Sequence, residues 1–204
     1  MTGRILTVRF ESALHHGSGF GLSGLVDRAV LRDGKDVPYL AGSAIKGKLR
    51  HATLRVLLSE GQSACRTGDT GVWCEEPNVC GLCELFGSPR HTGDLLFTDA
   101  YPEEETKRLL QELARLPRMN GLHRDSAIRA RSSIGRKVGT TREGFLYSTE
   151  VLPEHIHFES RIWGDIGSRL ELLRKACRVV THFGSDSARG LGRCTMEVGG
   201  EVTR

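Results

Sequence analysis

The stretch HFGSDSARGLGRC, residues 182–194, lies between a helix-like segment and the last strand-like segment, so it decides how the chain closes its fold. It gathers small and cationic residues, namely Gly184, Arg189, Gly190, Gly192 and Arg193. Glycine allows close backbone approach and arginine clamps phosphates, so the stretch predicts a loop that contacts an anion. A plain helix-to-strand turn, in which glycine supplies positive φ angles, is the alternative.

Regular segments flank this loop and continue toward the N-terminus. Residues 168–183 have the apolar spacing of an amphipathic helix, and residues 193–202 close as a strand. Similar patterns predict strands at 4–13, 94–100, 145–151 and 155–163, and helices at 103–116 and at 43–59, the latter with Ser43 as N-cap. Without the insertions the order is strand, helix, strand, strand, helix, strand. This is the α+β, ferredoxin-like pattern, whose sheet is also the RRM-like scaffold of single-strand RNA-binding modules.

Length and composition are those of one globular domain. The 204 residues are 38% hydrophobic and 26% charged, and no apolar run is long enough to span a bilayer. The N-terminal stretch MTGRILTVRFES has no signal-peptide segment, so a reducing, cytoplasmic location is expected. We therefore expect residues 1–204 to form a single domain with insertions at 62–90 and 118–150.

Positive charge is concentrated in two places, although the net charge is only +4 and the pI is about 8.8. Between residues 118 and 142, Asp125 is the only acid among seven lysines and arginines. The helix predicted from residue 43 carries four cations before its first acid: Lys46, Lys48, Arg50 and Arg55. Such clusters are typical of a surface that binds a polyanion, and a solvated basic face is the alternative.

Four of the six cysteines follow the spacing C-x8-C-x5-C-x2-C: Cys65, Cys74, Cys80 and Cys83. Four thiolates in one irregular segment suit a tetrahedral zinc ion, and the site is expected to be structural because no ligand position is left for water. Two disulfides or free thiols are the alternatives, and His91 could replace one cysteine. The expected reducing location favours zinc. A second pair, His155 and His157, falls on one strand face but lacks a third metal ligand.

One glycine motif does not indicate a nucleotide cofactor. Residues 19–24, GFGLSG, match G-x-G-x-x-G, but β-like residues follow where a dinucleotide site requires a helix. The sequence has no G-x-x-x-x-G-K-[ST] loop either. A nucleotide cofactor is therefore not expected.

Asp27 is the acid that stands out, because it follows this glycine-rich segment on a loop, where catalytic residues tend to lie. From spacing alone, a turn aspartate or a pair with Arg28 is the simpler interpretation. His15 and His16 are adjacent and would point apart on an extended chain, so one of them could face a ligand.

Six stretches together resemble the RAMP superfamily of CRISPR-associated proteins, and more closely the Cas-seven-type backbone subunit of type III (Csm/Cmr-like) effector complexes. They occur in family order over nearly the whole chain: LHHGSG, GLVDRAVLRDGKDVPYLAGSAIKGKLRHA, CELFGS, GDLLFTDA, IGRKVGTTREGFLYSTEVLP and FGSDSARGLGRC. The most specific feature is the combination of a G-S-x-x-K-G-x-[LM]-R helix start with the C-terminal glycine-rich loop.

The resemblance implies a modified ferredoxin-like palm with an inserted thumb hairpin and a zinc-binding insertion. It implies that copies of the chain stack along one crRNA, beside other type III subunits that include the large polymerase-domain subunit, with no membrane partner. Each thumb kinks the guide–target duplex at regular intervals. In catalytic members, an aspartate in the loop after the first strand cuts the target RNA with Mg²⁺ or another divalent ion.

Carried onto this sequence, Asp27 takes the place of the catalytic aspartate and residues 129–143 form the thumb. The positions expected to bind RNA are His15, Ser18, Ser43, Lys46, Lys48, Arg50, Arg129, Arg131, Arg136, Lys137, Arg142, Gly184, Arg189, Gly190 and Gly192. The helix start at Ser43 presents free N–H groups, which suit a guide phosphate. The family's thumb commonly reads I-D-R, whereas this chain has Ile134-Gly135-Arg136, so the usual acid is missing.

The expected reaction is attack of the target's 2′-hydroxyl on its own phosphate, with Asp27 holding the metal or acting as base. The products would be a 2′,3′-cyclic phosphate and a 5′-hydroxyl. A non-cleaving crRNA-binding scaffold subunit and a precursor-crRNA processing endoribonuclease are the alternatives within the family. Such processing enzymes usually carry two ferredoxin-like halves, for which this chain is too short. A zinc protein unrelated to RNA is the third alternative.

Overall fold

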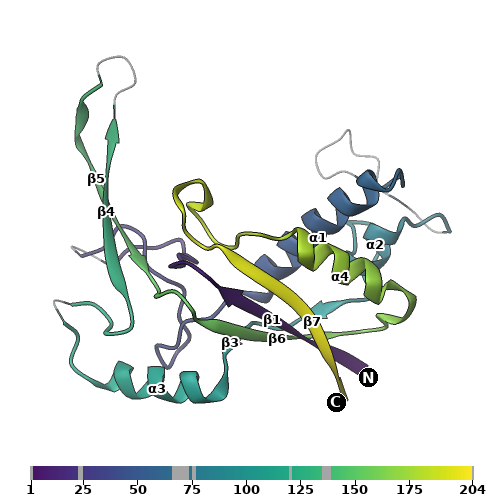
Figure 1. Ribbon diagram of the computed structural model, residues 1–204, viewed down its shortest axis with the longest axis horizontal. Helices are drawn as coiled ribbons and strands as arrows, with labels where there is room; N and C mark the ends of the chain where they lie inside the picture. Colours follow the sequence, from purple (N-terminus) through teal and green to yellow (C-terminus); the bar gives the residue numbers. More distant parts are fainter. Residues whose placement is uncertain are drawn as a thin grey trace.

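A computed structural model describes residues 2–22, 25–65, 74, 77–119, 121–134 and 139–203, and it shows a sheet-and-helix body from which a hairpin projects (Figure 1). The regular elements are β1 (Thr2–Phe10), α1 (Gly42–Ser59), α2 (Gly81–Phe86), β2 (Leu96–Phe97), β3 (Tyr101–Pro102), α3 (Glu104–Arg115), β4 (Ala127–Ile134), β5 (Thr141–Val151), β6 (His157–Trp163), α4 (Leu170–Val179) and β7 (Cys194–Thr203). Short 3-10 turns cover Gly167–Arg169 and Ser187–Arg189. The mixed α+β class predicted from the sequence is confirmed.

The main sheet has the ferredoxin-like strand order. Strands β2, β6, β1 and β7 lie side by side in that order, each antiparallel to its neighbour. The edge strand expected at 94–100 is instead divided into β2 and β3, which both pair with β6. It is interrupted because Ala100 exchanges backbone hydrogen bonds with Leu40, at 2.8 and 2.9 Å, just before α1.

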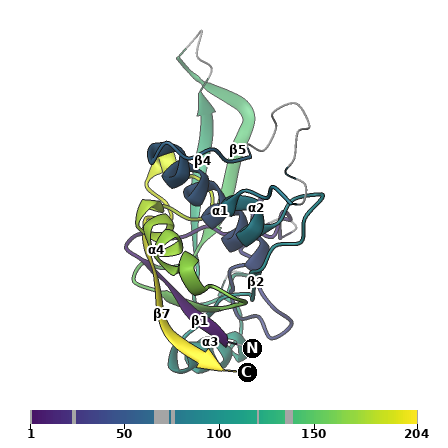
Figure 2. The ribbon, with the colours of Figure 1, turned by 90° about the vertical axis from the view of Figure 1, so that its right-hand side faces the viewer.

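Helices α1 and α4 lie side by side on one face of this sheet (Figures 1 and 2). Alternate residues of β1 are buried beneath them because side chains along a strand point to opposite faces. The buried set from β1, α1 and α4 includes Leu6, Val8, Phe10, Ile45, Leu49, Leu173 and Cys177. Each fully buried leucine or phenylalanine contributes about 1.5–3 kcal/mol relative to an exposed one, so this layer holds the palm together.

Side chains from other segments cap α1. Ala41 is the N-cap, whereas Ser43, which the sequence suggested for that role, lies exposed within the first turn. The N–H of Gly42 donates to Oδ1 of Asp99 at 2.7 Å, and the N–H of Ala41 donates to Nε2 of His16 at 3.2 Å. The helix start is therefore tied to the strand region and to the loop after β1.

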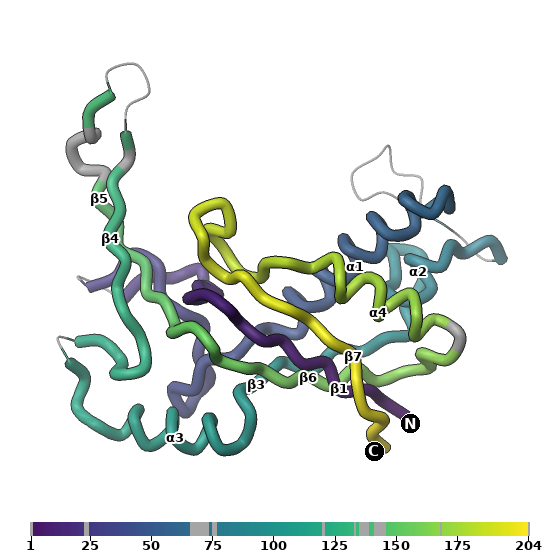
Figure 3. Tube along the Cα trace, in the orientation of Figure 1, coloured from purple at the N-terminus to yellow at the C-terminus, as the bar shows by residue number. Residues whose placement is uncertain are grey.

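Strands β4 and β5 form the projecting hairpin, which Figure 3 traces away from the palm. Their register runs from Ala127↔Val151 to Ile134↔Thr141, with an irregularity between Ser132 and Ile134. Of the long basic segment expected at 118–142, residues 127–134 and 141–142 belong to this two-stranded ribbon. Arg136 and Lys137 lie outside the described residues, as does the side chain of Arg142.

Two smaller expectations are also settled by the backbone. His155 does not share a strand face with His157, because His155 sits in a turn with φ 62° and β6 begins at His157. After residues 19–21 the chain forms a Leu22↔Val26 bridge, and the described residues that follow contain no helix before α1, so the expected failure of the dinucleotide motif is confirmed. No helix within the described part of the chain is long and apolar enough to cross a bilayer.

Candidate functional site

Three segments that are distant in sequence meet at the foot of the hairpin: the loop after β1, strand β5 and the loop between α4 and β7. The N–H of Ser185 donates to the carbonyl of His15 at 3.0 Å, and the N–H groups of Asp27 and Arg28 donate to the carbonyl of Ser148 at 3.2 Å. The two loops surround a hollow of about 340 Å³ lined by His15, His16, Gly17, Gly19, Phe20, Asp27, Arg28, Ala29, Gly184 and Ser185. Of the residues predicted from the sequence, the hollow brings together His15, Asp27 and Gly184.

Asp27 lies exposed at the edge of this hollow. Its Oδ2 accepts hydrogen bonds from the N–H of Ser148 at 2.6 Å and from the Ser148 hydroxyl at 3.1 Å. The backbone hydrogen bond first, and then the hydroxyl, hold the pKa of Asp27 below its ordinary value. Asp27 is therefore charged at neutral pH, and it suits a cation ligand better than a proton acceptor.

Arg131 and Arg189, both expected to contact RNA, converge on Asp186. Nη1 of Arg131 lies 2.8 Å and Nη1 of Arg189 lies 3.3 Å from Oδ1 of Asp186. Arg28 donates to Oδ2 of Asp186 at 3.0 Å, and Arg189 also donates to the hydroxyl of Tyr147 at 2.9 Å. Three guanidiniums share one carboxylate, so this group keeps a net positive charge beside the hollow.

The glycines of this loop serve two purposes. A Cβ at Gly184 would overlap the carbonyl oxygen of His15, and one at Gly192 would overlap that of Phe183, so both are needed for the loop to close. Gly190 has a φ of 80°, but a Cβ there would meet no atom within 4 Å, so its backbone is open to a ligand. Arg193 turns away and pairs with Glu11 at 2.9 Å.

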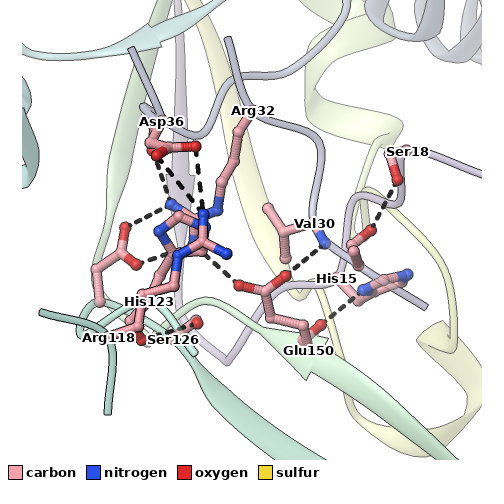
Figure 4. Close-up of polar contacts among 11 residues, drawn as sticks. His15, Ser18, Val30, Arg32, Asp36, Arg118, His123, Ser126 and Glu150 are labelled. Atoms are coloured by element: carbon pink, nitrogen blue, oxygen red, sulfur yellow. Dashed lines mark hydrogen bonds and ion pairs between the residues drawn. The ribbon is translucent and has the colours of Figure 1, made fainter. Parts of the chain in front are cut away.

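A buried ion-pair network lies next to His15, one of the residues that line the hollow (Figure 4). Arg32 donates twice to Asp125, at 2.8 and 2.9 Å, and once to Oε1 of Glu150 at 3.0 Å. Burial opposes the charge of Glu150, but hydrogen bonds from the N–H of Val30, at 2.8 Å, and from Arg32 outweigh it and lower the pKa of Glu150. The network joins the loop after β1 to the foot of the hairpin through one buried guanidinium that pairs with two carboxylates.

His15 and Ser18 support the loop from within. The Nδ1–H of His15 donates to the carbonyl of Glu150 at 2.7 Å, and the residue is only 1% exposed. Burial is the main cause that lowers the pKa of His15, so the ring is neutral at neutral pH. The Ser18 hydroxyl accepts the N–H of Phe20 at 3.2 Å and holds the turn of the glycine-rich segment. RNA contact by either residue stays a prediction.

The cations of α1 are divided between two faces of the helix. Lys46 and Arg50 are four residues apart and so lie on one side with Ser43, whereas Lys48 faces the neighbourhood of Cys194. Arg50 lines a separate groove of about 420 Å³ with His51 and residues 87–89. One hydrogen bond that links the hollow to the start of α1 runs from the N–H of Ala41 to His16. Arg129 is exposed on β4.

Phe20 was missed by the sequence reasoning, although it lines the hollow and is 78% exposed. Large aromatic side chains lose favourable free energy when they stay in water, so this exposure favours a contact with a ligand. By contrast, the open face of the main sheet carries charges of both signs, with Arg9 paired to Glu197 at 3.0 Å. In register with Thr7 at its centre lie Glu159 on β6 and Glu197 on β7.

The four cysteines Cys65, Cys74, Cys80 and Cys83 gather in one place, with their sulfur atoms within 4.8 Å of one another. All four are free thiols, which argues against the two-disulfide alternative, and His91 is not part of the described cluster. Sulfur ligands of a tetrahedral zinc sit about 2.3 Å from the metal, so this arrangement is compatible with a zinc site. Burial opposes ionisation of Cys80, but backbone N–H groups of Cys65 and Cys83 help lower its pKa to about 7.

A protein family and two solved structures are similar to this chain. The family model described as the RAMP superfamily matches residues 7–195. A cryo-EM structure of the Type III-B Cmr-beta bound to cognate target RNA is similar, with a TM-score of 0.65, 14% identity and 96% of each chain covered. The Type III-B Cmr-beta in the apo state gives a TM-score of 0.62, 12% identity and 96% coverage of each chain. These likenesses show the fold alone. No curated protein matches the sequence.

Proposed function

Because this chain belongs to the RAMP superfamily, we propose that it is a crRNA-binding backbone subunit of a type III CRISPR effector complex that cleaves bound target RNA through Asp27. One observation carries this proposal. The exposed carboxylate of Asp27 lies at the rim of a hollow that also holds Arg28 and the start of the glycine-rich loop. A polyanion held by the cations would pass beside that carboxylate.

The RNA path that we propose runs over the hollow and along the hairpin. Phosphates would contact Arg28, Arg189 and the open backbone at Gly190, because guanidiniums and N–H groups are the common phosphate ligands in proteins. Phe20 would stack on an unpaired base, since aromatic side chains serve as sequence-tolerant platforms for single strands. Ser43, Lys46 and Arg50 would hold the guide backbone farther along α1.

For the reaction, we propose in-line attack of the target's 2′-hydroxyl on the adjacent phosphate. Arg28 and Arg189 would hold the phosphate and offset its charge, and Phe20 would keep the neighbouring base out of the stack. Asp27, charged and exposed, would hold a divalent ion such as Mg²⁺, because carboxylate oxygen is the ligand type that this ion prefers. When bound, such an ion supplies charge stabilisation at the phosphate.

In the same proposal, a structural zinc ion is held by the four cysteines. The insertion that carries them leads directly into α2, whose Leu82 and Leu85 belong to the main core. Metal binding would therefore fix the segment after α1 to the palm. Assembly with further copies of the chain and with other type III subunits belongs to this proposal as well.

The decisive experiment is target-RNA cleavage by the assembled complex with Mg²⁺, comparing wild type with Asp27→Asn. Asp165→Asn is a matched control, because it makes the same change of charge at an exposed site after β6. We expect cuts at regular spacing that disappear only in Asp27→Asn, while target binding persists. The products should end in 2′,3′-cyclic phosphate and 5′-hydroxyl, and a 3′-hydroxyl end would rule out this chemistry.

Two other outcomes would replace the proposal. If Asp27→Asn cuts as fast as wild type, or if neither cuts, the chain is a guide-holding scaffold without nuclease activity. If the purified chain carries no nucleic acid and binds none with a steep dependence on salt, the zinc-protein alternative is favoured, because phosphate contacts make affinity strongly salt-dependent.

A further inference from the structure

Asp186 holds a position that the proposed function does not explain. Its φ of 61° lies in the left-handed region, which residues other than glycine adopt at a cost, and its side chain is only 11% exposed. A carboxylate in an RNA-facing loop also repels phosphate. Three guanidiniums contact this carboxylate and offset its charge.

These contacts clamp the loop onto one pair of residues in the hairpin. Arg131 on β4 and Tyr147 on β5 are directly opposite each other in the register. Asp186 binds Arg131 at 2.8 Å, and Arg189 donates to Tyr147 at 2.9 Å, so both members of the pair are held by the same loop. The position of the loop is therefore fixed relative to β4 and β5 together.

The same carboxylate reaches the segment that carries Asp27. Arg28 donates through Nη1 to Asp186 at 3.0 Å and through Nη2 to the Ser185 hydroxyl at 2.9 Å. Arg28 is the next residue after Asp27, and Asp27 is itself hydrogen-bonded to Ser148, beside Tyr147 on β5. The loop, the hairpin and Asp27 thus form a closed ring of contacts in which Asp186 is the common member.

The three arginines differ in how far they are available to RNA. The side chain of Arg131 is only 13% exposed, whereas those of Arg28 and Arg189 are 39% and 57% exposed. Arg131 therefore anchors the cluster, while the other two guanidiniums retain surface on which a phosphate can bind. A planar guanidinium that is already oriented loses less freedom when it binds phosphate.

We propose that Asp186 is a positioning residue whose carboxylate orients Arg28 and Arg189 toward a phosphate and so sets where Asp27 lies relative to bound RNA. This inference rests on the proposed function for its reaction, but not for its structural effect. It separates Asp186 from an ordinary surface charge, because the two roles predict different cleavage rates. If Asp186 were only a surface charge, its removal would tighten RNA binding and leave the cleavage rate unchanged.

The test compares Asp186→Asn with the Asp165→Asn control in the assembled complex. We expect Asp186→Asn to assemble and to bind target RNA at least as tightly as wild type. The single-turnover cleavage rate should nevertheless fall about tenfold to a hundredfold, because small displacements of a catalytic group cost that much. Asp186→Glu keeps the charge but lengthens the side chain, so it should restore the rate only in part. Hydrogen exchange at residues 25–31 should be faster in Asp186→Asn.

If Asp186→Asn is less stable than wild type, its lower cleavage rate alone does not test the inference. A double-mutant cycle with Arg28→Gln then provides the test. Non-additive losses in the two variants would support a shared role, and additive losses would overturn it. Unchanged cleavage and exchange, with tighter binding, would also overturn it. If wild type itself does not cleave, the proposed nuclease activity fails, and the inference is then judged by exchange at residues 25–31 alone, where no change would refute it.

Discussion

At the scale of the single residue, the chemistry open to Asp27 depends on Ser148. One carboxylate oxygen accepts two hydrogen bonds from that residue, at 2.6 and 3.1 Å, and the pKa of Asp27 is lowered as a result. A carboxylate in this state is charged throughout the neutral range, so it attracts cations and takes up protons poorly. The two roles that the sequence left open for Asp27, metal ligand and base, are therefore not equally supported.

The pH dependence of cleavage distinguishes these roles. Because the pKa of Asp27 is lowered, its charged form is lost only as the pH falls below the ordinary carboxyl range, and we expect no inflection due to Asp27 between about pH 5 and pH 8. Ser148→Ala removes the hydroxyl donor and keeps the N–H, so the pKa of Asp27 should rise only part of the way. Rate profiles and a carboxyl-carbon NMR titration measure both. An inflection near neutral pH that coincides with the NMR titration of Asp27 would assign the residue as a base.

Phe20 provides a second prediction at this scale. It is 78% exposed, so Phe20→Ala should change the free energy of unfolding by no more than about 0.5 kcal/mol. Loss of a stacked base should weaken single-stranded RNA binding about fivefold to a hundredfold, and Phe20→Trp should preserve it. Leu109→Ala is the control, because Leu109 is 55% exposed on α3. Reduced self-association with unchanged RNA affinity would instead assign Phe20 to a contact between copies of the chain.

At the scale of the element, the glycine-rich loop combines a structural and a binding role, which two matched variants can separate. Gly190→Ala and Gly192→Ala both place alanine at a positive φ, which costs about 1–2 kcal/mol. Only Gly192→Ala also forces a Cβ against the carbonyl of Phe183, so it should destabilise the protein clearly more. Chemical denaturation measures the difference. Equal losses of stability would mean that the loop can rearrange around Gly192.

The cysteine insertion allows an independent test at the same scale. We expect one zinc ion per chain, and cobalt substitution should give the thiolate-to-metal absorption of a four-sulfur site. Cys80→Ser should lower metal content and stability together, because α2 passes from this cluster into the core. Cys177→Ala, which alters a buried cysteine outside the cluster, should retain the metal. Full zinc content in Cys80→Ser would show that the ligands lie elsewhere.

The sequence predicts best those elements that are formed by interactions between residues close together in the chain. Helices α1, α3 and α4 have apolar spacing of their own, and their positions agreed with the pattern to within a few residues. The cap of α1 did not, because the groups that satisfy its first N–H groups, Asp99 and His16, come from elsewhere in the chain. Ser43 has the right chemistry for a cap, but other contacts set the helix start two residues too early for it.

At the scale of the whole molecule, the same reasoning explains what was found and missed in the site. Asp27, Arg189 and the glycines carry local signals, or a family resemblance, that a single segment can show. The roles of Asp186 and Phe20 can be recognised only in the folded protein, where three distant segments meet. The partners of Asp186, for example, are residues 28, 131 and 189. No spacing rule links those positions, so only the fold could reveal them.

Two buried histidines, His15 and His123, and the half-buried His16 make the stability of the protein depend on pH. Burial is the main cause that lowers the pKa of His15, His16 and His123 below the ordinary value of 6.5. Between the lowered pKa values and pH 6.5, the unfolded chain binds more protons than the folded one. Stability is therefore fully present above about pH 6.5 and is lost as the pH falls.

We accordingly expect the free energy of unfolding to decrease from about pH 7.5 to about pH 5.5. His16→Gln keeps an acceptor for the N–H of Ala41 but removes one titrating group, so its decrease should be smaller than that of wild type. His51→Gln, at an exposed position on α1, should decrease as wild type does. Wild type and both variants keep the four cysteines, so any loss of metal at acidic pH affects their stabilities equally. The difference in stability between variants at one pH therefore reports the histidine alone. A stability that rises on acidification would mean that the folded protein holds these rings in their charged form, which the donation of the Ala41 N–H to His16 does not allow.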